Sequence, residues 1–348
     1  MIIVMQLGAT DQQVNAVAQI LKDHGVEPLI LPGEDRVAIG IPQSLTPDQR
    51  ENIESALARA EGISKISQTS RPYKLASLEF QRARTTVNVK GVSIGGDSFT
   101  VMAGPCSIES YEQLARTAEI VQKAGATVLR GGAFKPRTSP YSFQGLAEEG
   151  LKIMQRVGNE TGLATITEVM SPDAVDMVAS YVDILQIGAR SMQNYPLLIK
   201  AGESQKPVFL KRGPSATIDE FLLAAEYLLS KGNRNIILCE RGIVSIDRSY
   251  TRNTLDLASV PVLKNYSHLP VFVDPSHGTG VAKYVPPMAK AAVVAGADGL
   301  MIEVHPNPDE ALSDGSQALL PKQFELLMQD LRQLAEICDR KMAAAVSR

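Results

Sequence analysis

The chain has 348 residues, of which 44% are hydrophobic and 21% are charged, as is usual for a globular domain in water. A formal net charge of −3 and a pI near 5.9 exclude a global attraction to nucleic acid or anionic membranes, so any cationic site must be local. No apolar run approaches the roughly 20 residues of a membrane span, and the amino terminus lacks a signal-peptide layout. The three cysteines do not have the spacing of a disulfide framework, which indicates reduced thiols and a cytoplasmic protein.

Residues 1–70 have the pattern of a separate small domain. Four short apolar runs predict strands, at 2–5, 29–31, 37–41 and 63–67. Two helices are expected between them, and each has a capping box at its start, Thr10 with Gln13 and Thr46 with Gln49. The order β-α-β-β-α-β is that of the ferredoxin-like fold. No residue here has catalytic chemistry, so we interpret the domain as a binding or regulatory module, with a structural oligomerisation domain as the alternative.

Residues 71–98 are expected to form a linker with a hairpin, because apolar and polar residues alternate around glycine turns. The hairpin could cap the bottom of the domain that follows. From residue 99 onward, apolar strands alternate with amphipathic helices such as 217–230. Eight strands are predicted, at 99–105, 127–131, 164–169, 184–189, 208–212, 235–241, 271–276 and 299–305. About 250 residues with eight βα units predict an α/β fold, a (β/α)₈ TIM barrel over 99–348, with an open doubly wound sheet as the alternative.

The stretch 127–145, TVLRGGAFKPRTSPYSFQG, is the densest cationic segment of the chain. Arg130 stands at the end of a predicted strand, and Lys135 and Arg137 follow on a backbone that prolines stiffen. Guanidinium and ammonium groups on a rigid backbone suit phosphate and carboxylate oxygens. A solvated basic loop is the simpler alternative, but the strand-end position and the further cations described next favour an anion site.

Every predicted barrel strand contributes a polar or charged group at its carboxyl end, and in a TIM barrel these ends share one mouth. Six cations are expected to converge there: Arg130, Lys135, Arg137, Arg190, Lys211 and Arg241. Because like charges repel, a substrate with two phosphates, or with a phosphate and a carboxylate, would balance them. A single arginine could instead pair with a carboxylate such as Glu168 or Glu240. Strand alternation puts Arg212 on the other side from Lys211, so we assign Arg212 to a structural salt bridge.

A second group of four residues follows the first, seventh and eighth strands: Cys106, His277, Glu303 and Asp314. A thiolate, an imidazole and two carboxylates suit a borderline divalent ion such as Mn²⁺, Fe²⁺, Co²⁺ or Zn²⁺ better than Mg²⁺ or Ca²⁺. No short ligand spacing supports this site, and a lone cysteine is usually a packing residue. The first, seventh and eighth strands are adjacent in a closed barrel, however, which favours a shared site. Cys239 and Cys338 have no such neighbours and are interpreted as packing residues.

Eight motifs, in their order along the chain, resemble those of the 3-deoxy-D-arabino-heptulosonate 7-phosphate (DAHP) synthase family: GPCS at 104, LRGGAFKPRTSPYSFQG at 129, QIGAR at 186, LKRG at 210, CERG at 239, DPSHGTG at 274, IEVHP at 302 and SDG at 313. The resemblance covers essentially the whole chain and is to the short class with a ferredoxin-like regulatory domain. It implies a metal-dependent condensation of phosphoenolpyruvate with erythrose 4-phosphate, the first step of the shikimate pathway to the aromatic amino acids. It also implies a homo-oligomer, a tetramer, and feedback control by tyrosine or phenylalanine, although the residues do not identify the effector.

The resemblance also implies roles for individual residues. The metal ligands would be Cys106, His277, Glu303 and Asp314. Phosphoenolpyruvate would be held by Arg190, Lys211 and Arg241, with its carboxylate near Arg130 and Lys135. The sugar phosphate would be held by Arg137, Thr138 and Ser139. The catalytic residues would be Lys135, Cys106 and His277. Our own hypothesis for the mechanism is that Lys135 donates a proton to the new alkoxide.

Two alternatives to this function stay open. The sister enzyme, 3-deoxy-manno-octulosonate 8-phosphate synthase, shares the barrel and uses arabinose 5-phosphate. The segment KPRTS, where that family has a sequence nearer KANRSS, favours the shorter sugar, and Cys106 argues against the metal-free branch of the sister family, which has Asn there. The second alternative is a non-catalytic sensor of phosphorylated metabolites, which would keep the cations but would not need all four metal ligands.

Overall fold

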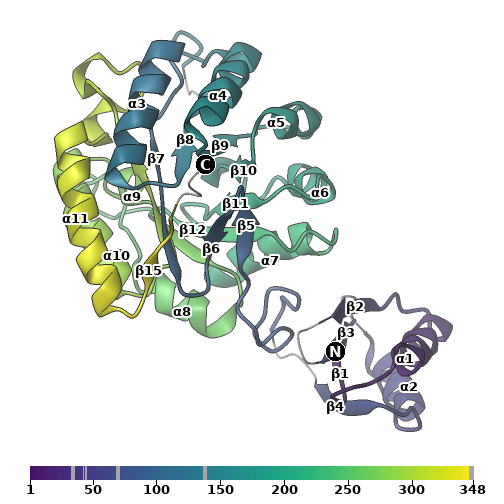
Figure 1. Cartoon of the computed structure of the whole chain (residues 1–348). Helices are drawn as coiled ribbons and strands as arrows, with labels where there is room; N and C mark the ends of the chain where they lie inside the picture. Colours follow the sequence, from purple (N-terminus) through teal and green to yellow (C-terminus); the bar gives the residue numbers. More distant parts are fainter. Residues whose placement is uncertain (33–35, 42, 44, 68–70, 136–138, 345–348) are drawn as a thin grey trace. The chain divides into compact units, whose positions relative to one another are not determined.

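The computed structural model describes residues 1–32, 36–41, 43, 45–67, 71–135 and 139–344. The chain forms two compact units (Figure 1), one of Met1–Ala83 with Tyr266–His268 and one of Arg84–Asn265 with Leu269–Arg348. The domain boundaries at residues 70 and 98 stay predictions. Within the described ranges, every helix is too short or too polar to cross a membrane.

The small unit has the predicted ferredoxin-like fold. Its sheet has the order β2-β3-β1-β4, built from β1 (Ile2–Met5), β2 (Leu29–Pro32), β3 (Val37–Gly40) and β4 (Ile63–Ser67). All neighbouring strands are antiparallel. Helices α1 (Asp11–Asp23) and α2 (Pro47–Leu57) pack against each other beside the sheet (Figure 1). Both predicted capping boxes are present, so the sequence signals for the two helix starts are confirmed.

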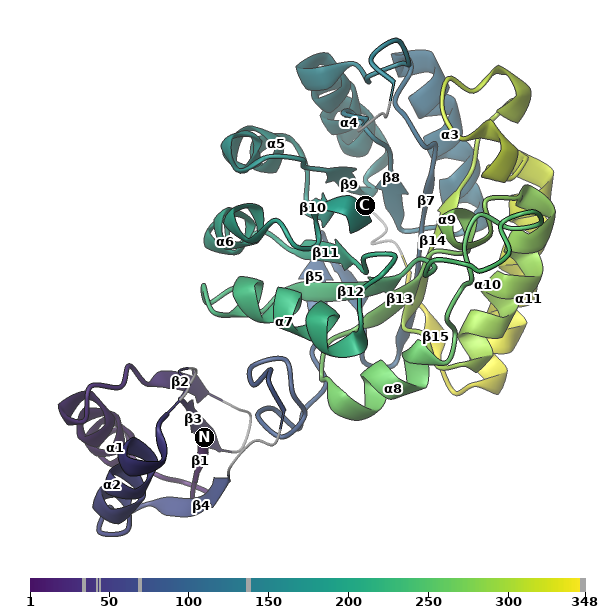
Figure 2. The same cartoon turned by 180° about the vertical axis from the view of Figure 1, so that it is seen from behind.

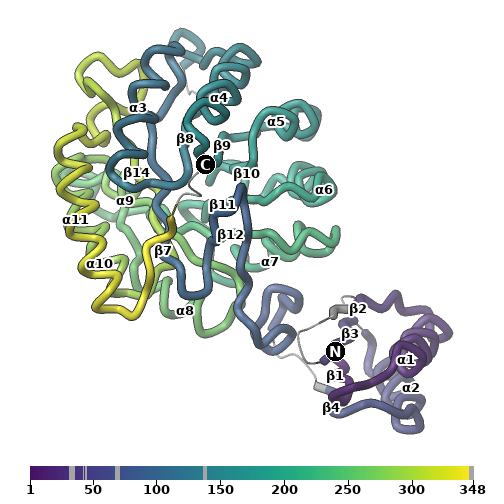
Figure 3. Tube along the Cα trace, in the orientation of Figure 1, coloured from purple at the N-terminus to yellow at the C-terminus, as the bar shows by residue number. Residues whose placement is uncertain are grey.

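The large unit is a closed barrel of eight parallel strands. In ring order they are β7 (Ser98–Gly104), β8 (Val128–Arg130), β9 (Ala164–Glu168), β10 (Ile184–Ile187), β11 (Val208–Lys211), β12 (Ile236–Glu240), β13 (Val271–Val273) and β14 (Gly299–Glu303). Figure 3 follows the chain once around this ring. The first and last strands pair in parallel, with Leu300 opposite Val101, so the ring is closed. Closure excludes the open doubly wound sheet.

Helices form a ring outside the strands (Figures 1 and 2). They are α3 (Tyr111–Ala124), α4 (Ala147–Thr161), α5 (Val175–Tyr181), α6 (Tyr195–Glu203), α7 (Ile218–Leu229), α8 (Ser259–Tyr266), α10 (Val285–Val294) and α11 (Pro321–Ile337). The predicted helix over 217–230 corresponds to α7, whose N-cap Thr217 shares a capping box with Glu220. Helix α3 ends at Gly125, where φ is +104°, a left-handed conformation that glycine adopts without strain.

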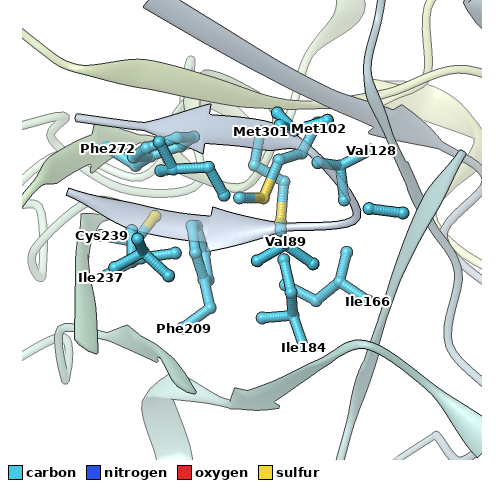
Figure 4. Packing of buried hydrophobic residues seen from close by; sticks show 14 residues of the cluster. Val89, Met102, Val128, Ile166, Ile184, Phe209, Ile237, Cys239, Phe272 and Met301 are labelled. Atoms are coloured by element: carbon cyan, nitrogen blue, oxygen red, sulfur yellow. The ribbon is translucent and has the colours of Figure 1, made fainter. Parts of the chain in front are cut away.

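The predicted hairpin is present as β5 (Val87–Val89) and β6 (Val92–Ile94), joined by Lys90 and Gly91, both at positive φ. Its apolar side chains and inward-facing side chains of the barrel strands make one buried cluster (Figure 4). Cys239 belongs to this cluster, so its interpretation as a packing residue is confirmed. The hairpin lies beside the start of β7, where Gly95 bridges to Ser98. Burying each of its large apolar side chains contributes about 1.5–3 kcal/mol to the stability of the barrel.

One predicted strand is wrong in its second half. We expect the seventh strand to run over 271–276, but β13 ends at Val273 and a short helix, α9 (Pro275–Thr279), follows it. The physical reason is that Asp274 is an N-cap, whose side chain accepts the N–H of His277, while Pro275 at the first helical position has a suitable φ. The short helix turns the His277 side chain towards the carboxyl end of the barrel strands.

Replacing Asp298 with Ala is expected to destabilise the large unit by about 3–5 kcal/mol, because two cations would lose their buried counter-charge. Asp298 is 1% exposed and accepts hydrogen bonds from Lys264 Nζ at 2.7 Å and from an Arg340 guanidinium nitrogen at 2.7 Å. Urea unfolding measures the loss. The control is Asp330→Ala, which removes an exposed pair with Lys290 and should cost less than about 1 kcal/mol. Equal losses in the two variants would contradict the prediction.

Candidate active site

The site is built around the side chain of Cys106, which follows β7. Its Sγ lies 3.2 Å from Oδ2 of Asp314 and 3.3 Å from Oγ of Ser313, and Lys135 Nζ donates to it at 2.8 Å. Burial, reinforced by the negative charge of Glu303, raises the pKa of Cys106 to about 12. Without a bound cation the group is therefore a thiol that donates to Asp314. A cation that replaced the thiol proton would restore the thiolate.

Glu303, at the end of β14, is fully buried and held on both oxygens. Arg130 donates to its Oε1 at 3.0 Å, and Nε2 of His277 lies 3.4 Å from the same oxygen. Gln317 donates to Oε2 at 2.7 Å. Burial acts to raise the pKa of Glu303, but His277 and Arg130 outweigh it, so the pKa lies below its usual value. The carboxylate is ionised in this position.

Asp274 connects the imidazole to the cationic side of the site. Its Oδ2 accepts from Lys211 Nζ at 2.6 Å and lies 2.7 Å from Nδ1 of His277. Burial acts to raise the pKa of Asp274, but His277 and Lys211 outweigh it and hold the pKa well below its usual range. Burial lowers the pKa of His277, although the negative charge of Asp274 acts in the opposite direction. Because ionised Asp274 can only accept, Nδ1 of His277 carries a proton, and Nε2 is the ring nitrogen that faces Glu303.

The donor atoms fit a borderline divalent ion. The Cys106 sulfur and a carboxylate oxygen from each of Glu303 and Asp314 lie within 4.8 Å of one another. Nε2 of His277 lies 3.4 Å from Oε1 of Glu303, one of these three residues. The other ring nitrogen, Nδ1, is held by the Asp274 carboxylate, which is the arrangement typical of metal-bound histidines. The structure thus brings three of the four predicted ligands into one cluster and places the fourth, His277, beside Glu303. Asp314 is held at φ +52°, an uncommon backbone conformation for a non-glycine residue.

The predicted cations fall into three groups. Arg130, Lys211 and Arg241 are buried, with exposed fractions of 4%, 3% and 9%. Lys135 is half-buried, and Arg190, in the 3₁₀ turn Ala189–Ser191 after β10, is exposed. Two of the buried cations have a carboxylate partner, Glu303 for Arg130 and Asp274 for Lys211.

Arg241 is the exception among the buried cations. It forms no ion pair with any carboxylate in the described part of the chain, although Asp274 is near enough to raise its pKa. Burial acts in the opposite direction and lowers that pKa overall. A buried guanidinium without a paired anion is costly, so this position suits an anionic ligand.

The predicted sugar-phosphate residues are described only in part. Arg137 and Thr138 lie outside the described residues. Ser139 is exposed, and its Oγ accepts the N–H of Tyr141 at 3.3 Å.

Arg212 makes ion pairs at 2.9 Å with both Glu240 and Asp256, which confirms its interpretation as a structural salt bridge.

Comparisons with known proteins agree with this geometry. Residues 76–340 match the model of the DAHP synthetase I family, and residues 1–68 match that of the DAHP synthase ferredoxin-like domain. The chain belongs to the DAHP synthetase I family. It is therefore an enzyme of the DAHP synthase type, and the ferredoxin-like assignment of its small unit is confirmed.

Relatives of this DAHP synthase family member include a protein of Thermotoga maritima named phospho-2-dehydro-3-deoxyheptonate aldolase, 44% identical over 97% of this chain and 98% of the relative. A crystal structure of the DAHP synthase of Thermotoga maritima superposes with a TM-score of 0.77 at 43% identity, covering 98% of each chain. A 2-dehydro-3-deoxyphosphooctonate aldolase of Syntrophobacter fumaroxidans is 34% identical over 72% of this chain and 91% of its own. The sister enzyme is thus related, but over less of the chain.

Sequence reasoning missed four residues of this DAHP synthase site: Asp274, Ser313, Gln317 and Arg252, whose NH1 lies 3.6 Å from Oδ1 of Asp314. A usable signal exists for Asp274, because an Asp before a proline at the end of a predicted strand is typical of a helix N-cap. Ser313 directly precedes a predicted ligand. No sequence pattern around Gln317 or Arg252 indicates a role in the site, because each contacts a residue that is distant in the sequence.

Proposed function

We propose that the protein condenses phosphoenolpyruvate with D-erythrose 4-phosphate and water to give DAHP and inorganic phosphate, the first step of the shikimate pathway. The observation that supports this function best is the contact between Lys135 Nζ and the Cys106 sulfur at 2.8 Å. It joins the cationic residues and the metal-ligating set in one site. Such a site can bind two phosphorylated substrates and supply electrophilic chemistry between them.

The cations supply the anion binding that this reaction needs. We assign phosphoenolpyruvate to Arg190, Lys211 and Arg241, with its carboxylate towards Arg130 and Lys135, and the sugar phosphate to Arg137, Thr138 and Ser139. Mutual repulsion between two polyanions is the main obstacle to bringing them together, and fixed positive groups remove it. Holding both substrates in reacting orientation also converts a bimolecular encounter into an intramolecular one.

Cys106, His277, Glu303 and Asp314 would hold one divalent ion, Mn²⁺, Fe²⁺, Co²⁺ or Zn²⁺. The mixed sulfur, nitrogen and oxygen set supports this choice. When bound, the ion supplies a Lewis acid that can polarise the aldehyde oxygen of the sugar or position a water. Asp274 holds the His277 ring in the ligating tautomer, and Glu303 is ionised, so two of the four ligands are preorganised.

The reaction proceeds through bond changes that balance without any other reagent. C3 of phosphoenolpyruvate attacks the aldehyde carbon of the sugar, and Lys135 donates a proton to the new alkoxide. Positive charge develops at C2, water adds there, and its released proton restores Lys135. The resulting hemiketal expels inorganic phosphate and leaves the C2 ketone of the product. The half-buried ammonium of Lys135, fixed by two hydrogen bonds to Cys106, is held still for this transfer.

We propose regulation for the small unit. Its ferredoxin-like fold contains no catalytic side chain, and the family description associates such domains with DAHP synthases. Feedback control by tyrosine or phenylalanine, in a homotetramer, is the arrangement that fits the shikimate function. Free thiols at Cys106, Cys239 and Cys338 suit the reducing cytoplasm.

Release of inorganic phosphate tests the reaction. Protein loaded with Mn²⁺ should release phosphate from phosphoenolpyruvate when erythrose 4-phosphate is present, and at a much lower rate with arabinose 5-phosphate. Faster turnover of arabinose 5-phosphate would identify the octulosonate synthase instead. Binding of both substrates without phosphate release would identify a sensor.

Exchanging Cys106 for Ser is expected to lower metal affinity by at least about 10-fold, because a hard hydroxyl replaces the soft ligand. Mn²⁺ and Zn²⁺ titrations of chelator-treated protein measure it. The control is Cys338→Ser at the end of α11, for which no change is expected. A strong chelator should abolish wild-type activity, and full turnover in rigorously metal-free protein would reject the ligand set.

A further inference from the structure

We infer that Gln317 is a positioning residue, which sets the orientation of the Glu303 carboxylate, and that Arg252 fixes Gln317 in turn. The two residues connect the segment between β12 and α8 with the metal-ligating carboxylates. This inference rests on the proposed function, because it concerns the readiness of that site to bind its ion.

Gln317 is buried, with 1% of its surface exposed, at the end of the 3₁₀ turn Gly315–Gln317 that follows Asp314. Its Nε2 donates to Oε2 of Glu303 at 2.7 Å, and its backbone N–H donates to the carbonyl of Asp314 at 3.2 Å. Gln317 therefore contacts one proposed ligand through its side chain and another through its backbone. In ligand sites, groups that hold the ligands in this way decide their orientation.

Arg252 decides which end of the Gln317 amide faces Glu303. Its NH1 donates to Oε1 of Gln317 at 3.2 Å, so the amide oxygen is occupied by a donor and the amide nitrogen must point to Glu303. The same NH1 lies 3.6 Å from Oδ1 of Asp314. The backbone N–H of Arg252 donates to the carbonyl of Thr279 at 2.8 Å, which fixes the segment that carries the guanidinium.

The two carboxylate oxygens of Glu303 therefore have different partners. Oε2 is occupied by Gln317, whereas Oε1 faces Arg130 and Nε2 of His277. Without the amide donor, a fully buried oxygen would lack its partner, and the carboxylate would gain by rotating towards another donor. Rotation would misalign Glu303 with the other ligands. The same segment begins with Arg241, a proposed substrate ligand, so its position affects both halves of the site.

The test is a Mn²⁺ titration of chelator-treated Gln317→Met, a variant of similar shape and equal charge. We expect the Mn²⁺ dissociation constant to rise about 10–100-fold, the range typical for loss of such a partner. The metal-free variant should melt at a somewhat lower temperature than wild type, because Oε2 of Glu303 loses its donor, but should stay folded at the temperature of the titration. The matched control is Gln323→Met, on the exposed start of α11, with wild-type affinity expected. Affinity of Gln317→Met within about two-fold of wild type would overturn the inference. Failure of wild type itself to bind Mn²⁺ would instead reject the proposed function.

Arg252→Lys tests whether Arg252 fixes Gln317. The Arg252 side chain is 41% exposed, so this variant should fold even if Gln317→Met does not. Lysine keeps the charge but not the guanidinium geometry, so a several-fold weaker Mn²⁺ affinity is expected in the wild-type background. In the Gln317→Met background, the same change should have less than a two-fold effect. An unchanged affinity for Arg252→Lys alone, or an equal loss in both backgrounds, would show that Arg252 does not act through Gln317.

Discussion

Lys135→Met is expected to lower kcat by about 10²–10⁴-fold, the usual contribution of a positioned general acid. The ammonium of Lys135 donates to both the sulfur and the carbonyl oxygen of Cys106, so it is fixed where the two substrates are proposed to meet. Methionine keeps most of the side-chain volume but has no proton to give. Phosphate release at saturating substrate concentrations measures the effect.

Two controls separate proton donation from other effects of Lys135→Met. Lys152→Met, on the exposed face of α4, should keep wild-type kcat. The Mn²⁺ affinity of Lys135→Met should be no weaker than that of wild type, because removing a positive charge beside Cys106 does not disfavour a cation. A kcat within 10-fold of wild type, measured with metal fully bound, would exclude Lys135 as the proton donor.

Asp274→Asn is expected to lower both stability and activity strongly. Lys211, which is 3% exposed, would lose its buried counter-charge, and His277 would lose the carboxylate that orients its ring. Breaking one partner of a buried pair costs about 3–5 kcal/mol in free energy of unfolding. Because one residue holds both a proposed substrate ligand and a proposed metal ligand, activity should fall below detection even under conditions where the variant is folded.

Urea unfolding and phosphate release measure these two effects of Asp274→Asn. The control is Asp176→Asn, which weakens an exposed ion pair with Lys200 and should cost less than about 1 kcal/mol with no loss of kcat. If Asp274→Asn unfolds at the same urea concentration as wild type, the buried ion pair has no structural importance. If it keeps full activity, Asp274 does not position Lys211 and His277.

The barrel could be predicted from sequence because its signals are local. Each strand is a short apolar run, and each helix start carries a capping residue, as at Thr217. The largest error in the strands is the extension of the seventh strand beyond Val273, through Asp274 and Pro275. Those two residues together are a helix start, and the local chemistry of the cap overrides the hydrophobic pattern.

The proposed ligands could be predicted for a different reason, since all lie at or just after strand ends that share one mouth. Their partners could not. Lys211 ends β11, and Asp274 directly follows β13. Side chains from alternate strands share a layer of the barrel, so Lys211 Nζ and Asp274 Oδ2 lie 2.6 Å apart although the residues are 63 positions apart in the sequence.

The most direct test of the proposed metal-dependent condensation is a product assay with metal-loaded protein. Phosphoenolpyruvate and erythrose 4-phosphate, mixed with the wild-type chain and Mn²⁺, should yield one inorganic phosphate for each seven-carbon keto sugar phosphate formed. Prior removal of the metal should stop both products, and its return should restore them together. Undiminished formation of the sugar in the rigorously metal-free protein, or phosphate release without any sugar product, would contradict the account.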